Sequence, residues 1–168
     1  IAGLGSIGRR VADVAKAFGC RVVYFSASGH TYETEFKRVS FDELLENSDI
    51  ISIHAPLNDK TNNLFDDAAF AKMKKNAVLL NLGRGPIVNN AALTKALKEN
   101  IIAGAGLDVI DKEPIAADNP LLEIQDSSKL IITPHIAWAT YEARVRLMDE
   151  VYENIKAFEA GESRNAVV

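Results

Sequence analysis

Short apolar runs alternate with amphipathic segments along the chain. Five runs have the length of buried strands and end at Gly, Pro or polar residues: 21–25, 50–54, 78–82, 103–109 and 130–133. Apolar residues at helical spacing predict helices at 7–18, after a capping box at 40–43, and at 66–73, 90–99 and 140–160. The stretches 26–39 and 111–129 are expected to be irregular. This alternation predicts an α/β fold with a doubly wound, mostly parallel sheet of Rossmann type covered by helices on both faces.

Two of the predicted helices have an apolar face. In the first, Ile7, Val11, Val14, Ala15 and Phe18 fall at helical spacing, and in the last the apolar face is formed by Ala143, Leu147, Val151, Ile155 and Phe158. Cys20 stands beside the second strand and is expected to be a buried thiol.

The chain opens on a strand end that runs into a Gly-rich turn and then into the first helix. The turn has the spacing Gly-x-Gly-x-x-Gly, at Gly3, Gly5 and Gly8. In a dinucleotide site the first glycine allows a tight turn, the second lets the backbone approach a pyrophosphate, and the third lets the helix pack close to the strand. Such glycines also occur in ordinary turns. Here the order strand, turn, helix and strand favours a dinucleotide site with phosphate at the helix N-terminus.

Composition and charge exclude several classes of partner. The 168 residues are 48% hydrophobic and 25% charged, as in a globular domain, and the net charge of −4 with scattered basic residues argues against nucleic acid. No apolar run approaches the roughly 18 residues that span a bilayer. Cys20 is the only cysteine, so no intrachain disulfide can form, and a reducing, cytoplasmic setting is expected. The chain begins without Met, so we expect further sequence upstream, where any targeting segment would lie.

Charged side chains follow the later strands. Arg84 and Asp108 come at the ends of two of them, Glu113 lies in the next loop, and His135 follows the last strand. Because parallel strands end at one edge of the sheet, these residues are expected on the edge that carries the Gly-rich turn. Arg84 can bind a carboxylate bidentately, His135 can donate and accept a proton, and Glu113 can hold the imidazole by its other nitrogen. Taken singly, each also fits a turn, surface or capping role; together they indicate hydride chemistry on a carbonyl.

Five motifs in a fixed order carry a resemblance to a known family. They are Gly3-Leu4-Gly5-Ser6-Ile7-Gly8, His54-Ala55-Pro56-Leu57 with Thr61, Asn81-Leu82-Gly83-Arg84-Gly85, Gly106-Leu107-Asp108-Val109 with Glu113-Pro114, and Thr133-Pro134-His135-Ile136. With these motifs the chain resembles the D-isomer-specific 2-hydroxyacid dehydrogenases over nearly all of its length. The resemblance implies Arg84 as substrate anchor, His135 as acid and base, and Glu113 as its partner, with no metal.

The resemblance also implies a nicotinamide cofactor. The implied contacts are Ser6 and Ile7 at the pyrophosphate, Ala55, Pro56 and Thr61 near the adenosine half, and Leu82, Asp108 and Ala137 toward the nicotinamide, where Arg84 and His135 also stand. Members that prefer NAD place an acid at the end of the second strand, whereas this chain has Ser26. NAD is expected. NADP is the alternative, because no carboxylate repels a 2′-phosphate there, although no arginine stands in that loop to bind one.

The implied organisation is a dinucleotide-binding domain at 1–139 and a C-terminal helix and tail at 140–168 that pack toward a substrate domain missing upstream. The implied activity interconverts a small 2-oxo acid and its D-2-hydroxy acid in a homodimer. Trp138 and the run 142–144 resemble the corresponding residues of glycerate and hydroxypyruvate dehydrogenases. The alternative is an NAD(H)-binding, corepressor-like assembly module with little turnover. A purely structural dimerisation domain would leave Arg84, Glu113 and His135 without a reason to converge.

Overall fold

The computed structural model describes residues 1–167. The chain divides into two compact units, the first being Ile1–Pro134 and the second beginning at His135. In the first unit, β3 (Ile50–Ile53), β4 (Val78–Asn81), β5 (Gly104–Leu107) and β6 (Leu130–Ile132) pair in that order, all in parallel. The short strands β1 (Val23–Tyr24) and β2 (Lys37–Arg38) form a second parallel pair.

Ala2 joins these two sheets at the start of the chain. It makes a parallel bridge to Phe25, just after β1, and another to Ile53 at the end of β3. The chain therefore runs outward from Ala2 to β1 and β2, and then returns to build β3 to β6 on the other side. In open parallel sheets ligands bind at the point where the strand order reverses, outside the carboxyl ends of the strands. The predicted doubly wound, Rossmann-type sheet is confirmed, and its reversal point lies at the Gly-rich turn.

The predicted helices are all present, and side-chain caps begin most of them. The helices are α1 (Ser6–Ala17), α2 (Phe41–Asn47), α3 (Asp67–Lys72) and α4 (Asn90–Lys98) in the first unit and α5 (Tyr141–Glu159) in the second. Ser40 caps α2 by accepting a hydrogen bond from the backbone N–H of Glu43 at 3.0 Å, as the capping box predicts. Asp66, Asn89 and Thr140 cap α3, α4 and α5 in the same way. Across residues 1–167, no helix is both long and apolar enough to cross a membrane.

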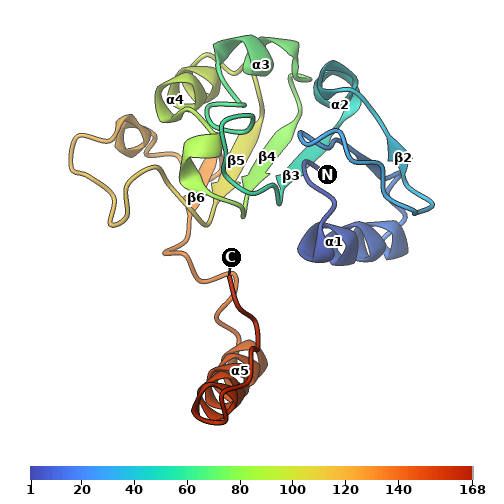
Figure 1. Cartoon of the computed structure of the whole chain (residues 1–168). Coiled ribbons are helices and arrows are strands. Elements are labelled where there is room, and N and C mark those ends of the chain that lie inside the picture. The colour runs from blue at the N-terminus through green and yellow to red at the C-terminus, as the bar shows by residue number, and fades with distance from the viewer. Residues whose placement is uncertain (168) are drawn as a thin grey trace. The chain divides into compact units, whose positions relative to one another are not determined.

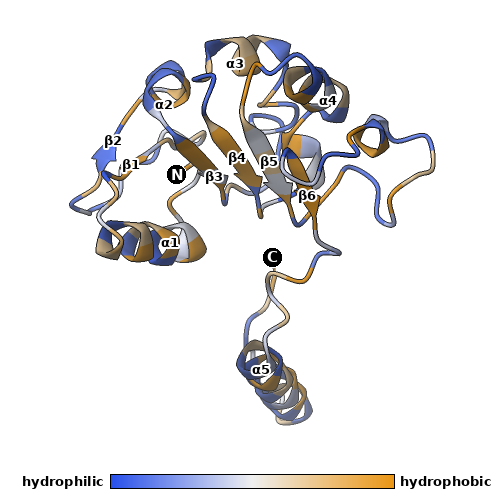
Figure 2. Cartoon of the chain, turned by 180° about the vertical axis from the view of Figure 1, so that it is seen from behind, coloured by the Kyte–Doolittle hydropathy of each residue, from blue (hydrophilic) through white to orange (hydrophobic). Residues whose placement is uncertain are grey.

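Helices cover both faces of the sheet in the first unit. Figures 1 and 2 show α2, α3 and α4 together on one side and α1 on the other. The main core lies under α2 to α4, where Leu45, Phe70 and Leu93 pack with strand residues such as Leu79 and Leu107. Figure 2 shows β3 and β4 as hydrophobic strands, although Ile50 and Ile131 are exposed on the sheet.

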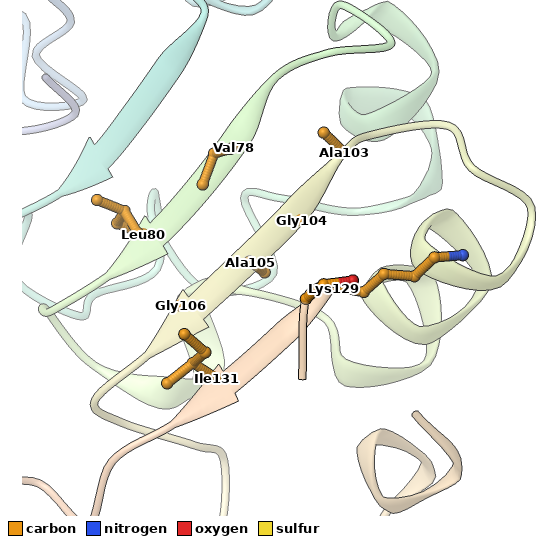
Figure 3. Close-up of a pocket in the computed structure, with 9 residues that line it drawn as sticks. Val78, Leu80, Ala103, Gly104, Ala105, Gly106, Lys129 and Ile131 are labelled. Carbon is orange, nitrogen blue, oxygen red and sulfur yellow. The ribbon is translucent and has the colours of Figure 1, made fainter. Parts of the chain in front are cut away.

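Strands β4, β5 and β6 line an apolar hollow of about 230 Å³ on the face of the sheet opposite the main core. Because side chains alternate along a strand, Leu79 enters the main core while its neighbours Val78 and Leu80 line the hollow. Figure 3 shows Gly104, Gly106 and Ile131 completing the lining. The charged residue in the lining, Lys129, donates a hydrogen bond to Asn100 at 2.8 Å. The hollow therefore lacks a polar cluster that could carry chemistry.

The apolar spacing on α1 does not mark its buried face, and the expected burial of Cys20 is wrong. On α1 the buried residues are Gly8 and Ala12, whereas Ile7, Val14 and Phe18 are exposed. At Gly8 no side chain would fit, because a Cβ there would lie 2.1 Å from the carbonyl oxygen of Gly3. Cys20 is exposed rather than buried, since the turn after α1 carries it away from the core.

Two stretches that were expected to be irregular contain short elements. The stretch 26–39 includes the edge strand β2, whose residues are both charged and exposed and therefore give no apolar strand signal. The stretch 111–129 includes a 3₁₀ turn, η2 (Pro120–Glu123), which Asn119 caps. In the second unit, Leu147, Val151, Ile155 and Phe158 of the expected apolar face of α5 are exposed.

Candidate active site and cofactor cleft

A cleft of about 300 Å³ lies at the reversal point of the sheet. It is formed by the Gly-rich turn, by the segment after β1 and by the segment after β3. Its lining residues are Gly3, Leu4, Gly5, Ser26, Ala27, Ser28, Tyr32, His54, Ala55, Pro56, Asn58 and Thr61. Six residues of the predicted cofactor set line this cleft: Gly3, Gly5, Ser26, Ala55, Pro56 and Thr61.

The three glycines of the turn meet three different steric demands. Gly3 has a left-handed backbone with φ 96°, and a Cβ there would lie 2.6 Å from the backbone N of Ala55. A Cβ on Gly8 would lie 2.1 Å from the carbonyl oxygen of Gly3, so only glycine allows α1 to pack this close. A Cβ on Gly5 would meet nothing within 4 Å among the described residues, which leaves its backbone accessible from the cleft. These are the demands of a tight turn, close helix packing and an open approach.

The N-terminus of α1 begins at this turn. Gly5 is its N-cap residue, and within the described chain no side chain accepts a hydrogen bond at this cap. The first-turn residues Ser6 and Ile7 are exposed. Helix N-termini carry backbone N–H groups without intrahelical partners and a partial positive charge, so this end of α1 suits a phosphate group.

The segment after β3 forms the opposite wall of the cleft. Thr61 is buried, and its hydroxyl lies 2.7 Å from the carbonyl oxygen of Pro56 and 2.8 Å from the backbone N of Asn58. The Thr61 hydroxyl therefore accepts from Asn58 and donates to Pro56, which holds the turn in shape. Thr61 therefore contributes to the cleft by fixing the position of the segment after β3.

His54 is a cleft residue to which the sequence analysis assigned no role. Its Nε2 atom lies 2.8 Å from the Ser52 hydroxyl, and its Nδ1 atom is buried without a hydrogen-bond partner among the described residues. Burial lowers the pKa of the His54 imidazole below its ordinary value, which favours the neutral form. The signal for this residue was its place directly after a buried strand, where the cleft of such a sheet lies.

Arg84 stands on a loop that a buried amide holds in place. Asn81, at the end of β4, is completely buried. Its Nδ2 atom donates to the carbonyl oxygen of Arg84 at 3.1 Å, and its Oδ1 atom accepts from the backbone N of Gly83 at 3.1 Å. The side chain of Arg84 is exposed and donates from Nη1 to the carbonyl oxygen of Gly83 at 2.8 Å. Asn81 is therefore a positioning residue for this guanidinium, a role that sequence reasoning missed.

The loop after β4 packs directly on the loop after β5. A Cβ on Gly85 would lie 1.8 Å from the carbonyl oxygen of Ile110, so the two backbones are in contact. The backbone N of Ile110 donates to Oε1 of Glu113 at 3.1 Å, which orders the carboxylate on that second loop. The loops that carry Arg84 and Glu113 are thus neighbours at the carboxyl edge of the sheet, as expected from the parallel topology.

Asp108 closes the gap between the last two strands. It is buried, its backbone N donates to the carbonyl oxygen of Asn81 at 3.0 Å, and its Oδ1 atom accepts from the Thr133 hydroxyl at 2.6 Å. Leu82 lies beside it along this edge and is partly exposed. Asp108 therefore ties the ends of β4, β5 and β6 together.

His135 begins the second unit, two residues after Thr133. Its backbone is left-handed with φ 53°, a conformation that costs non-glycine residues free energy and that concentrates at functional sites. Its carbonyl oxygen accepts from Nε1 of Trp138 at 2.9 Å, and the backbone N of Ala139 donates to the carbonyl oxygen of Ile136 at 2.9 Å. These bonds make the segment that contains Ala137 a compact turn.

Comparison with known proteins assigns the chain to a family. The model of the D-isomer specific 2-hydroxyacid dehydrogenase, NAD binding domain, matches residues 1–137. The glyoxylate reductase of Korarchaeum cryptofilum is 43% identical over 165 residues, which are 96% of this chain and 49% of that protein. The hydroxypyruvate reductase of Blautia hydrogenotrophica is 41% identical over 169 residues, 99% of this chain and 52% of that protein. The chain thus spans about half the length of the curated relatives it matches.

Solved structures agree with this assignment. The D-lactate dehydrogenase of Lactobacillus jensenii with NAD⁺ has a TM-score of 0.88 and 33% identity, over 99% of this chain and 54% of that one. An acyclic imino acid reductase in complex with NADPH and D-Arg has a TM-score of 0.87 and 36% identity, over 99% of this chain and 52% of that one. The matched fold, the Gly-rich turn at the reversal point and the family model lead to one conclusion: the chain belongs to the D-isomer specific 2-hydroxyacid dehydrogenases, in which it corresponds to the NAD-binding domain.

Proposed function

We propose that the cleft holds a nicotinamide dinucleotide across the reversal point of the sheet. Gly5, Ser6 and Ile7 at the start of α1 would take the pyrophosphate, since this helix end is accessible and has no side-chain cap among residues 1–167. Ser26, Ala55, Pro56 and Thr61 would surround the adenosine half, and Leu82, Asp108 and Ala137 the nicotinamide. The observation that carries this proposal is the cleft itself, whose walls are the turn of Gly3 and the ends of β1 and β3.

We further propose that the full-length protein interconverts a small 2-oxo acid and its D-2-hydroxy acid. The nicotinamide supplies or accepts the hydride. Arg84 binds the substrate carboxylate, a role that its exposed guanidinium on a well-ordered loop supports. His135 gives the substrate oxygen its proton during reduction and takes it back during oxidation, and Glu113 orients the imidazole.

Substrate turnover distinguishes a dehydrogenase from a module that binds NAD(H) without catalysing a reaction. The full-length protein should oxidise NADH or NADPH when hydroxypyruvate or glyoxylate is added, as measured by the loss of nicotinamide absorbance. Hydroxypyruvate is the first substrate to try because relatives that reduce it are similar over nearly the whole chain. Tight cofactor binding without turnover of any small 2-oxo acid would instead support an NAD(H)-dependent assembly module.

Ser26, the second residue after β1, should control the choice between the two cofactors. Replacement of Ser26 by Asp should weaken NADPH binding at least tenfold relative to NADH, because a carboxylate there repels the 2′-phosphate. The measurement is the ratio of the two dissociation constants, obtained by titrating nicotinamide fluorescence. Ser26→Ala, which removes the hydroxyl without adding charge, is the control. An NADPH to NADH ratio that stays the same in Ser26→Asp would mean that Ser26 does not face the ribose.

For the remaining organisation we propose a dinucleotide domain at 1–139 and a terminal helix at 140–168 that packs toward a substrate domain. The exposed apolar residues of α5, among them Leu147, Met148 and Val151, support such packing. The net charge of −4 supports the absence of nucleic-acid binding, and the single cysteine is consistent with a cytoplasmic setting. The proposed homodimer rests on the family resemblance alone. Size measurement of the full-length protein in solution tests the dimer.

A further inference from the structure

A guanidinium from β2 reaches the segment that follows β1, which the sequence pattern did not indicate. Ser26 and Ser28 line the cofactor cleft, and their hydroxyl oxygens lie 3.1 Å apart. The backbone N of His30 donates to the Ser28 hydroxyl at 3.3 Å. The cleft therefore ends in a pair of adjacent hydroxyl groups at the place where an adenosine ribose would lie.

Arg38 reaches this segment from β2, ten residues further along the chain. Its Nη1 atom donates to the Thr31 hydroxyl at 3.0 Å. Its Nη2 atom lies 3.9 Å from the position that a Cβ on Gly29 would occupy, so the guanidinium lies against the residue next to Ser28. Thr31 uses only one of the five N–H donors of the guanidinium, which leaves most of its planar donor array for a ligand.

The basic side chains around this segment differ in whether an acid is paired with them. Lys16 is paired with Glu35, and Lys37 is paired with Glu43 at 2.8 Å. In contrast, Arg38 and Arg9 form no salt bridge within the part of the chain that the structure describes. The guanidinium carbon of Arg9 lies 4.9 Å from the centre of the Tyr32 ring, which lines the cleft. Of these two arginines, Arg38 is the one that lies beside the hydroxyl pair, whereas Arg9 lies against Tyr32.

We propose that Ser26, Ser28 and Arg38 form a subsite for the 2′-phosphate of NADP(H), with Arg38 as its charged recognition residue. A phosphate dianion prefers hydroxyl donors and a guanidinium with two parallel N–H groups. The absence of an acid at Ser26 removes the repulsion, and Arg38 supplies the attraction. The cleft accordingly takes NADPH at least as tightly as NADH. This inference rests on the proposed function, since it specifies the cofactor of the same cleft.

Binding measurements on the full-length protein test the subsite without reference to turnover. The probes are NADPH and NADH, titrated separately by nicotinamide fluorescence. Arg38→Ala should weaken NADPH binding about tenfold and change NADH binding less than about twofold, because only the 2′-phosphate loses its charged partner. Lys37→Ala is the matched control, since it removes one positive charge from the adjacent exposed residue of the same strand. It should leave both affinities unchanged.

The outcomes separate this inference from the proposed function. Selective loss of NADPH affinity in Arg38→Ala, partly restored in Arg38→Lys, supports the subsite. If the unmodified protein binds NADH well and NADPH more than tenfold more weakly, or if Arg38→Ala and Lys37→Ala behave alike, the subsite is wrong and the proposed function stands. If neither dinucleotide binds to the folded protein, both are overturned.

Discussion

Replacement of His135 by Asn should lower the turnover of a 2-oxo acid by roughly a hundred- to ten-thousand-fold in the full-length protein. Cofactor affinity should change by less than about twofold, because the proposed role of the imidazole is proton transfer to the substrate. Asn is the informative replacement, since it tolerates the left-handed backbone of His135, with φ 53°, and cannot exchange protons near neutral pH. His135→Ala should lose turnover as well, with an added cost in local stability.

The two His135 variants need two measurements each. Steady-state turnover with a 2-oxo acid gives the loss of activity, and fluorescence titration gives the cofactor affinity. Thermal unfolding shows that the fold is retained. Turnover in His135→Asn close to that of the unmodified protein would remove His135 from the acid and base role. A collapse of cofactor affinity in both variants would assign the residue to cofactor binding instead.

Replacement of Gly85 by Ala should destabilise the protein by about 3 kcal/mol, a large part of the usual stability of a domain. The added Cβ would lie 1.8 Å from the carbonyl oxygen of Ile110 and close to the backbone N of Asp111. Neither neighbour is a flexible side chain, so the loop of Arg84 must move away from the loop of Glu113. We expect turnover to fall beyond the loss of folded protein, because this movement displaces Arg84.

Gly5→Ala is the control for the Gly85 substitution. A Cβ on Gly5 meets no atom within 4 Å in the described chain, and its φ of −74° is available to any residue. Urea unfolding should therefore show nearly unchanged stability for Gly5→Ala and a clear loss for Gly85→Ala. In the cleft the methyl group stands where a pyrophosphate would approach, so Gly5→Ala should weaken cofactor binding. Equal stabilities for the two variants would contradict the contact between the two loops.

Local signals predicted the elements well because their causes are local. The hydroxyl of Ser40 and the carboxylate of Asp66 satisfy backbone N–H groups only three residues away, so the starts of α2 and α3 are written in a few adjacent residues. The strand runs at 50–54 and 78–82 are also recognisable in the sequence, because most of their residues are at least partly buried and therefore apolar. The buried face of α1 could not be predicted in this way, because it depends on a contact with another segment. Apolar spacing marked Ile7, Val14 and Phe18, but the buried residues are Gly8 and Ala12. At Gly8 the close approach of the Gly3 carbonyl leaves no room for a side chain.

Some residues of the candidate site could also be predicted from the sequence, and others could not. The residues Arg84, Asp108 and Glu113 could be placed at one sheet edge from sequence, since parallel strands always end on the same side. The roles of Asn81, His54 and Arg38 could not, because each depends on contacts between segments. Asn81 acts through the backbone of the Arg84 loop, His54 through burial in the cleft, and Arg38 through the return of β2 beside β1.

By itself, the sequence determined the parallel α/β fold, the Gly-rich turn with its three steric demands, and the family that five ordered motifs indicate. These features follow from periodicity, helix capping and the backbone freedom of glycine, each of which depends only on residues close together in the sequence. Only the tertiary structure decided which face of α1 is buried, how the loops of Arg84 and Glu113 meet at Gly85, and which arginine reaches Ser28. Those features depend on how closely separate segments approach, and that distance is set by packing of the whole first unit.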